Sequence, residues 1–299
     1  MRILVTGREG QVARSLLERG SLAGHEMIAL GRPELDLAGD AAAIVDAIEA
    51  ARPDVVVSAA AYTAVDKAGS ESDAAFAVNA NGPGAVAKAA RKLGVPLIHL
   101  STDYVFDGSK ASPYVEEDMP DPMGVYGASK LAGEDVVLAT HGNVAILRTA
   151  WVYSPFGANF VKTMLGLASD RDEVAVVADQ RGNPTSALDI ADGVLAVAAN
   201  LVANDDPVLR GIFHMTGSGE ASWAEFAEAI FAASAAAGGP SARVRPISTR
   251  DYPTPAKRPA NSRLDSSKLA LVHGTTLPDW KKSTETVVSR LVRSNGKVS

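Results

Sequence analysis

Short apolar runs alternate with longer helical segments along the first half of the chain. The runs are rich in valine, isoleucine and leucine, which is typical of strands buried on both faces of a parallel sheet. The helical segments include an alanine-rich stretch over 73–93, which ends at Gly94, and a second stretch over 126–138. This alternation predicts an α/β fold with a Rossmann-like, doubly wound parallel sheet. The predicted strands are 2–6, 26–30, 54–58, 95–100 and 143–147.

The alternation becomes less regular after residue 150. Ser222 and Glu225 have the spacing of a capping box, which predicts the start of a helix. We therefore predict an NAD(P)-binding domain over 1–150 and a smaller α/β domain over 151–299, mainly for substrate, with a part that packs back on the first sheet. The predicted segments are helices over 159–168, 188–202, 223–237 and 287–292, a polar turn over 179–185, a strand over 211–215 and an irregular proline-rich stretch over 246–261.

A glycine turn joins the first strand to the first helix. Gly7 and Gly10 belong to a GxxGxxA pattern, a variant of the dinucleotide fingerprint with Ala13 at the helix-packing position. Glycines allow the backbone to turn tightly and to approach a pyrophosphate, whose charge the helix N-terminus stabilises. The alternative is a strand-turn-helix glycine without a ligand.

The end of the second strand indicates which cofactor is preferred. NAD-specific proteins usually have an acidic residue there for the ribose diol, whereas this chain has Arg32. An arginine suits a 2′-phosphate, with Arg8 as a second cation, so NADPH is favoured over NADH. The alternative is a solvated surface arginine. After the third strand, the small residues Ala59 and Ala60 leave room for a cofactor.

Tyr126 and Lys130 are four residues apart, so a helix places both on one face. A tyrosine hydroxyl normally titrates near ~10. The ammonium one turn away, together with a cationic nicotinamide ring, is expected to favour the phenolate and to lower this pKa toward the working range. Thr102, at the end of an apolar run, places a hydroxyl where it can bind a substrate carbonyl. YxxxK alone is common by chance, but the preceding Ser-Thr and the nucleotide-binding start of the chain make it specific.

A long loop over 103–124 separates the predicted threonine and tyrosine. Loops of this length in compact domains are usually functional, and this one is expected to cover the site. Asn79, within the alanine-rich helix, is either a buried polar support for the site or an incidental polar residue.

Composition narrows the classes of partner. The net charge of −6 disfavours nucleic acid and anionic membrane surfaces but does not exclude an anionic small molecule. Cysteine is absent, and the five histidines are scattered singly, so we expect no metal site. The acidic turn at Glu116-Glu117-Asp118 is the one candidate for loose cation binding, and a solvated turn is the alternative. Apolar runs stay shorter than ~18 residues and a leader pattern is absent, so a cytoplasmic protein is expected.

Nearly the whole chain resembles the extended short-chain dehydrogenase/reductases, and within them the dTDP-4-dehydrorhamnose reductases. This resemblance implies NAD(P)H-dependent reduction of the C4 ketone of dTDP-4-dehydro-6-deoxy-L-mannose to dTDP-L-rhamnose. The motifs that carry it are Ser101-Thr-Asp-Tyr-Val-Phe106, Tyr126-Gly-Ala-Ser-Lys130-Leu-Ala-Gly-Glu134, Arg148-Thr-Ala-Trp151-Val-Tyr153, Asp179-Gln-Arg-Gly-Asn-Pro184-Thr185, Ala59-Ala-Ala-Tyr62 and Arg258-Pro-Ala-Asn-Ser262.

The resemblance also implies roles for single residues. The implied catalytic set is Thr102, Tyr126 and Lys130. The implied cofactor-binding residues are Gly7, Gly10, Gln11 and Val12 at the pyrophosphate, Ala59, Ala60 and Tyr62 along the cofactor, and again Tyr126 and Lys130, beside Arg32. The implied substrate-binding residues are Asp103, Tyr104, Trp151 and Asn159, with a core anchor as the alternative for Trp151.

Four positions depart from the family pattern. Ser58 replaces a common asparagine, and Glu9 places an anion near the diphosphate. Some relatives link two subunits through metal-bound glutamates, but the matching positions here are Ser15 and Leu188. Both a monomer and a homodimer remain open.

Two rival interpretations are a non-catalytic NADP-binding regulatory subunit and another nucleotide-sugar reductase, epimerase or dehydratase of the superfamily. A regulatory subunit does not need the threonine, tyrosine and lysine, which this chain has. A dehydratase needs a further acid-base pair, often Asp-Glu directly after the threonine, whereas Thr102 is followed by Asp103 and Tyr104. A simple reductase fits better.

Overall fold

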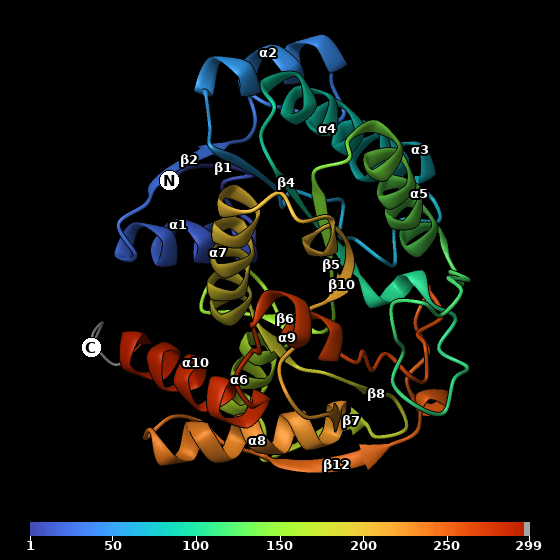
Figure 1. The fold of residues 1–299 in the computed structure, drawn as a ribbon. Helices are drawn as coiled ribbons and strands as arrows, with labels where there is room; N and C mark the ends of the chain where they lie inside the picture. The colour runs from blue at the N-terminus through green and yellow to red at the C-terminus, as the bar shows by residue number, and fades with distance from the viewer. Residues whose placement is uncertain (296–299) are drawn as a thin grey trace.

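The main sheet organises the molecule. The computed structural model describes residues 1–295 and contains a six-stranded parallel sheet in the order β10-β5-β4-β3-β1-β2 (Figure 1). This order confirms the doubly wound α/β fold predicted from the sequence. The strands are β1 (Arg2–Thr6), β2 (Glu26–Leu30), β3 (Val55–Ser58), β4 (Leu97–Thr102), β5 (Val144–Thr149) and β10 (Gly211–His214).

Helices cover both faces of this sheet, because its strands carry apolar side chains on both sides. Ile3 and Val5 face a core completed by two helices, whereas Leu4 and Val56 face the opposite core. The first face is covered by α1 (Gln11–Leu22) and α7 (Ala187–Ala203), and the second by α2 (Ala41–Ala51), α4 (Gly82–Leu93) and α5 (Val125–Thr140).

A second apolar cluster lies beside the sheet and is formed by residues after 150. Phe226 and Trp280 are buried in it and meet edge to face, with ring centroids 5.8 Å apart. A separate parallel pair of strands, β7 and β12, packs against this region (Figure 1). Its elements are α6 (Phe160–Asp170), β7 (Glu173–Val177), α8 (Trp223–Ala236), β12 (Arg243–Ile247) and α10 (Trp280–Asn295).

Short elements connect the two regions. The pair β6–β9 is parallel and the pair β8–β11 is antiparallel. None of the helices within residues 1–295 is long and apolar enough to cross a membrane. The connecting elements are β6 (Val152–Tyr153), β8 (Arg181–Gly182), β9 (Thr185–Ser186), β11 (Ala221–Ser222) and α9 (Ser267–His273), with 3-10 turns over Asp103–Val105, Pro207–Leu209 and Thr249–Asp251.

The predicted alanine-rich helix has an internal irregularity. Helix α3 (Ser72–Phe76) is followed by a π-helical turn over Ala77–Asn81, after which α4 begins. A π-turn shifts the register of side chains and is frequent at functional sites. The turn carries Asn79, whose side chain is fully buried. The π-helical turn therefore places the Asn79 amide within hydrogen-bonding distance of Tyr62 and Ser129.

The strand order reverses between β1 and β3. In such sheets, ligands bind beyond the carboxyl ends of the strands at the point of reversal. The residues at these ends are Thr6 in β1, Ser58 in β3, Thr102 in β4 and Thr149 in β5. The sheet therefore brings the predicted glycine turn, the alanines after β3 and the predicted threonine to one edge.

Candidate active site

Thr102 and Tyr126 meet where β4 ends and α5 begins. Gly127 allows this, because a Cβ added to it would lie only 2.1 Å from the carbonyl oxygen of Tyr104. The close contact brings the Tyr126 ring edge-on to Tyr104, with centroids 5.4 Å apart and planes at 76°. The structure thus brings together residues that the long loop separates in sequence.

The ionisation of Tyr126 differs from the sequence-based expectation. Burial raises its pKa above the usual value, and a hydrogen bond with the Thr102 side chain opposes this only in part. The Lys130 ammonium was expected to lower this pKa, but in the ligand-free protein it donates a hydrogen bond to the Leu100 carbonyl at 2.7 Å. The hydroxyl is therefore protonated at neutral pH in the ligand-free protein. The lowering of its pKa toward the working range beside a bound nicotinamide stays a prediction.

Lys130 lies one helical turn after Tyr126 on α5 and is 3% exposed. Burial lowers the pKa of its ammonium from 10.5 to about 8, while the carboxylate of Glu134 acts in the opposite direction. Lys130 is therefore mostly protonated at neutral pH and loses its charge at moderately alkaline pH. Such a lysine can place its positive charge beside a reacting oxygen.

Asp103 follows Thr102 directly and is 4% exposed. The Thr102 hydroxyl donates a hydrogen bond to its carboxylate at 2.9 Å. Burial raises the pKa of Asp103 to about 6, against hydrogen bonds from the Ser262 and Thr102 side chains. Asp103 and Tyr104 thus lie within the same cluster as the threonine and tyrosine, as their predicted substrate-side role requires.

The glycine turn has the shape that a pyrophosphate needs. Gly7 has a φ of +94°, and a Cβ there would be 3.2 Å from the Cβ of Ala60. Gly10 is the N-cap of α1; its surroundings are open, and α1 begins without a side-chain cap. Uncapped N–H groups at an open helix N-terminus are a ready site for an anion. The residues present therefore fit a dinucleotide.

Gln11 and Val12 contribute to this turn in different ways. The Val12 side chain packs against the sheet core, which leaves its backbone amide for a ligand. The Gln11 side-chain oxygen accepts hydrogen bonds from Ser154 at 2.9 Å and from Asn159 at 3.0 Å. The side chain of Gln11 therefore ties α1 to the second half of the chain, and its role at a pyrophosphate stays a prediction.

The segment after β3 is held in place from two sides. The Thr6 hydroxyl accepts hydrogen bonds from the amides of Ala59 at 3.0 Å and Ala60 at 3.1 Å. Asn79 accepts from the Tyr62 amide at 2.8 Å and donates to the Tyr62 carbonyl at 3.1 Å and to Ser129 at 3.0 Å. Asn79 is thus a buried polar support that joins this segment to the helix of Lys130.

Arg32 lies on the surface just beyond β2. Its neighbour Arg8 forms an ion pair with Glu34 at 2.8 Å and donates to the Ala29 carbonyl at 3.2 Å. The expected second cation is therefore engaged by a carboxylate in the ligand-free protein. The role of Arg32 at a 2′-phosphate stays a prediction.

Trp151 and Asn159 are engaged in packing and capping. Trp151 stacks on Trp223 with centroids 3.6 Å apart and planes at 9°. Asn159 is the N-cap of α6 and accepts from the Lys162 amide at 3.2 Å, while its amide group binds Gln11 and nearby carbonyls. The contacts of Asn159 lead toward the glycine turn rather than toward Tyr126. The predicted substrate roles of both residues remain predictions.

The predicted loose cation site is occupied by protein groups. Glu116 accepts from the His214 amide at 2.7 Å, and Asp118 pairs with Lys110. Glu117 lies 3.6 Å from Lys268. Within residues 1–295, clusters of three or more potential metal ligands are not found. Ser15 donates to the Gln11 carbonyl at 2.8 Å, and Leu188 packs against the cluster of Phe226 and Trp280.

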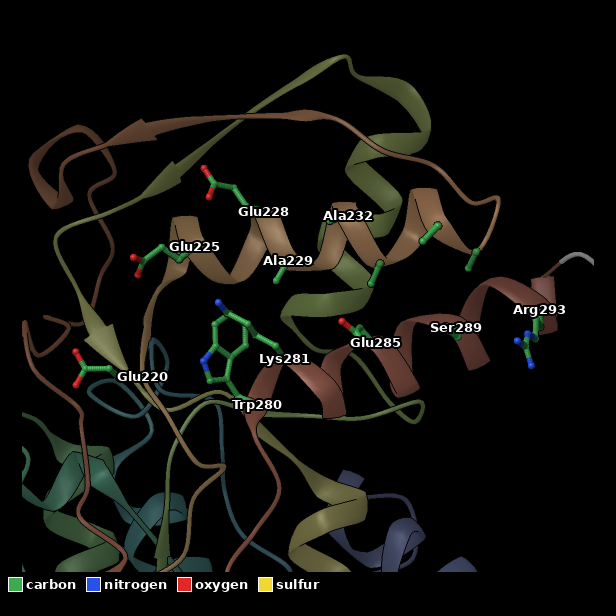
Figure 2. Close-up of a pocket in the computed structure, with 13 residues that line it drawn as sticks. Glu220, Glu225, Glu228, Ala229, Ala232, Trp280, Lys281, Glu285, Ser289 and Arg293 are labelled. Atoms are coloured by element: carbon green, nitrogen blue, oxygen red, sulfur yellow. The ribbon is translucent and has the colours of Figure 1, made fainter.

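Figure 2 shows a groove that lies elsewhere, between α8 and α10. It measures about 700 Å³ and is lined by alanines of α8, by Trp280 and by charged side chains such as Glu228 and Glu285. The residues of the Thr102–Tyr126 cluster do not line it. The groove is therefore separate from the candidate active site.

Sequence reasoning missed two residues of the site. Glu134 and Arg148 are each 1% exposed and form an ion pair behind Lys130. Glu134 ends the motif that starts at Tyr126, and Arg148 begins the motif that ends at Tyr153. Their positions in the sequence do not indicate that the two side chains face each other. The signal was the spacing of Glu134, one helical turn after Lys130.

Comparisons with known proteins show the family to which the chain belongs. The family model described as RmlD substrate binding domain matches residues 1–293. A dTDP-4-dehydrorhamnose reductase from Sinorhizobium fredii is 52% identical over 98% of each chain. A crystal structure of a dTDP-4-dehydrorhamnose reductase from Clostridium acetobutylicum has a TM-score of 0.90 and 38% identity over 97% of this chain and 99% of that one.

A second solved structure is a dTDP-4-dehydrorhamnose reductase from Bacillus anthracis in complex with NADP, with a TM-score of 0.88 and 35% identity over 96% of this chain and 98% of that one. These matches extend over almost the full length of every chain compared. The protein therefore belongs to the RmlD substrate binding domain family, together with these dTDP-4-dehydrorhamnose reductases.

Proposed function

We propose that this protein reduces the C4 ketone of dTDP-4-dehydrorhamnose to give dTDP-L-rhamnose, with NADPH as the reductant. The observation that carries the proposal is the cluster of Thr102, Tyr126 and Lys130 beside an open dinucleotide turn. Family membership supports it, since relatives with this name match almost the whole chain and one of them binds NADP.

The residues of the cluster divide the work of the reduction. NADPH, when bound, supplies the hydride for C4. Tyr126, which is protonated at neutral pH, donates the proton to the developing alkoxide. Thr102 donates a hydrogen bond to the same oxygen, and the Lys130 ammonium stabilises the negative charge that forms on Tyr126.

The remaining roles follow from position. Gly7, Gly10, Gln11 and Val12 are proposed for the pyrophosphate, Ala59, Ala60 and Tyr62 for the nicotinamide side, and Asp103, Tyr104, Trp151 and Asn159 for the sugar nucleotide. Residues 1–150 would then mainly bind the cofactor and 151–299 mainly the substrate, with β10 joining the sheet. We also propose a cytoplasmic enzyme that acts as a monomer or homodimer.

Transfer of deuterium tests the reaction directly. NADPH that carries deuterium at both C4 positions of the nicotinamide is incubated with enzyme and dTDP-4-dehydrorhamnose, and the product is analysed by NMR. The proposal expects dTDP-L-rhamnose with deuterium at C4 of the sugar. A product labelled at another carbon, or unlabelled, contradicts it, and an epimerase or a regulatory subunit would give no net oxidation of NADPH.

Arg32→Ala is expected to weaken NADPH binding and to leave NADH binding little changed. A lost charge-assisted contact to the 2′-phosphate costs roughly 1–3 kcal/mol, which is about 5- to 150-fold in Kd. Titration of the variant with each cofactor measures this. Arg52→Ala, at the end of α2, is a surface control. An equal loss for both cofactors would show that Arg32 does not contact the 2′-phosphate.

Removal of divalent metal is expected to leave activity unchanged. Tyr126 and Thr102 supply electrophilic help at the carbonyl oxygen by hydrogen bonding, so a Lewis acid is not required. Dialysis against EDTA followed by an NADPH-oxidation assay measures this, with untreated enzyme as control. Activity that disappears and returns only with magnesium would refute the prediction.

A further inference from the structure

The ion pair behind Lys130 is almost completely shielded from solvent. Arg148 Nε lies 2.9 Å from one carboxylate oxygen of Glu134, and Nη2 lies 2.6 Å from the other. Both side chains are 1% exposed. Burial of two charges carries a large desolvation cost, and an apolar pair of similar size often stabilises a fold as well or better. Stability alone therefore does not explain this pair.

The pair joins β5 to α5 and β4, the two elements that carry the catalytic cluster. Glu134 lies on α5, one turn after Lys130, and Arg148 lies on β5. Ser101 on β4 is the register partner of Arg148 and donates a hydrogen bond to Glu134. Because Ser101 immediately precedes Thr102, the carboxylate is linked both to the lysine helix and to the strand end that carries the threonine.

Neighbouring groups hold Arg148 in one orientation. Its guanidinium lies 5.1 Å from the centre of the Phe106 ring. Its Nη1 is buried without a hydrogen-bond partner among the residues that the structure describes. Arg148 is therefore committed to Glu134, and the carboxylate cannot leave without exposing an unpaired buried cation.

We propose that Glu134 is a positioning residue for the reduction: clamped by Arg148, it fixes the Thr102 strand end through Ser101 and favours the charged form of the Lys130 ammonium through its own negative charge. This inference rests on the proposed function, since it assigns a role in the same site. Glu134 acts through Lys130 and Ser101 and does not itself reach the reacting atoms.

The charges around Lys130 give this role an observable consequence. Glu134 opposes the effect of burial on the pKa of Lys130. His99 is held neutral, because burial and the Lys130 charge lower its pKa well below the usual value. The titratable and charged groups that face this region are Tyr126 and Glu134 from α5, His99 from β4, Asp103 after β4 and Arg148 from β5.

Glu134→Gln is therefore expected to lower the pKa of Lys130 below its wild-type value of about 8. A pH titration of ¹³Cε-lysine-labelled, ligand-free protein by NMR measures this, with the Lys130 signal assigned by its absence in Lys130→Met. This readout does not depend on any enzymatic activity, so failure of the proposed function and failure of this inference are distinguishable.

The pH dependence of kcat/KM for NADPH gives the second readout. The alkaline limb of Glu134→Gln is expected to move down with the lysine, so that activity is about tenfold below wild type at pH 9 and close to it at pH 6. Asp192→Asn is the matched control, because it breaks another bidentate pair, with Arg19, between α1 and α7. The control is expected to keep the wild-type profile.

The double variant Glu134→Gln/Arg148→Met removes both charges and avoids an unpaired arginine. It is expected to shift the Lys130 pKa in the same downward direction but by less than the single variant, because the Arg148 cation is removed together with the Glu134 carboxylate. This variant serves as the test if the single variant folds poorly. An unchanged lysine pKa in the folded variants, or a kcat/KM that falls by the same factor at every pH, would assign the pair a merely structural role and overturn the proposal.

Discussion

Tyr126→Phe is expected to lower kcat by ~10²-fold or more, because the variant lacks the proton donor. The fold is expected to persist, since the edge-on contact with the Tyr104 ring needs only the aromatic ring. The raised pKa of Tyr126 keeps the wild-type hydroxyl protonated at neutral pH, so the lost group is the donor itself. Steady-state kinetics with saturating NADPH measures the effect.

Tyr252→Phe is a suitable control. Tyr252 is 59% exposed, so this substitution removes a tyrosine hydroxyl from the surface and not from the site. It is expected to keep wild-type kcat. Thermal denaturation and NADPH binding establish that Tyr126→Phe is folded and binds its cofactor. Turnover of that variant near the wild-type rate would show that another group delivers the proton.

Lys130→Met is expected to reduce kcat/KM by roughly 10²-fold or more, since the negative charge on Tyr126 then forms without a neighbouring cation. Methionine has similar length and preserves the apolar contacts of the stem. Kinetics from pH 6 to pH 9 measures the loss. The loss is expected to be largest at low pH, where the wild-type lysine carries its charge. A variant that is impaired equally at every pH would contradict an electrostatic role.

The same variant is expected to change how stability depends on pH. Burial lowers the pKa of Lys130 from 10.5 to about 8, so between these values the unfolded chain binds more protons than the folded one. The free energy of unfolding of the wild type therefore rises with pH between about 8 and 10.5. Below about pH 8 the folded wild type carries the full destabilising effect of a buried ammonium. The Tm of Lys130→Met relative to wild type is expected to be higher at pH 7 than at pH 10. A constant difference would refute this.

Much of the main sheet could be predicted because its strands are continuous apolar runs. The strand predicted over 26–30 matches β2. The strand predicted over 95–100 differs from β4 by two residues at each end, and Ser101 and Thr102 extend the ladder with β5 despite their polarity. The strand over 243–247 was missed. It carries exposed arginines and a proline, so its pattern is that of a loop, and it forms only because β7 offers a pairing edge.

Other differences have equally local causes. Helix α2 went unpredicted because only Ile44, Val45 and Ile48 mark a buried face; its alanines favour a helix but do not show which side is buried. Helix α10 begins at Trp280 rather than at 287, since its first turns are polar and are anchored by the burial of that tryptophan. Such elements depend on tertiary contacts that a local pattern does not contain.

The candidate site was predictable where a motif states the chemistry and not where packing decides it. Thr102, Tyr126 and Lys130 lie where the strand-end and helical spacing placed them. In the ligand-free protein the pKa of Tyr126 is raised, which the motif did not indicate, because desolvation depends on atoms from distant segments. Asn159 caps a helix and binds Gln11, which no spacing within its own motif indicated.

The most direct test of the central claim is a comparison of substrates. Purified enzyme and NADPH are incubated with a panel of 4-keto nucleotide sugars that differ in the sugar or the base, and kcat/KM is measured for each. We predict the highest value for dTDP-4-dehydrorhamnose, with dTDP-L-rhamnose as the product. NADPH oxidation that is absent with this sugar, or faster with another member of the panel, would contradict the assignment.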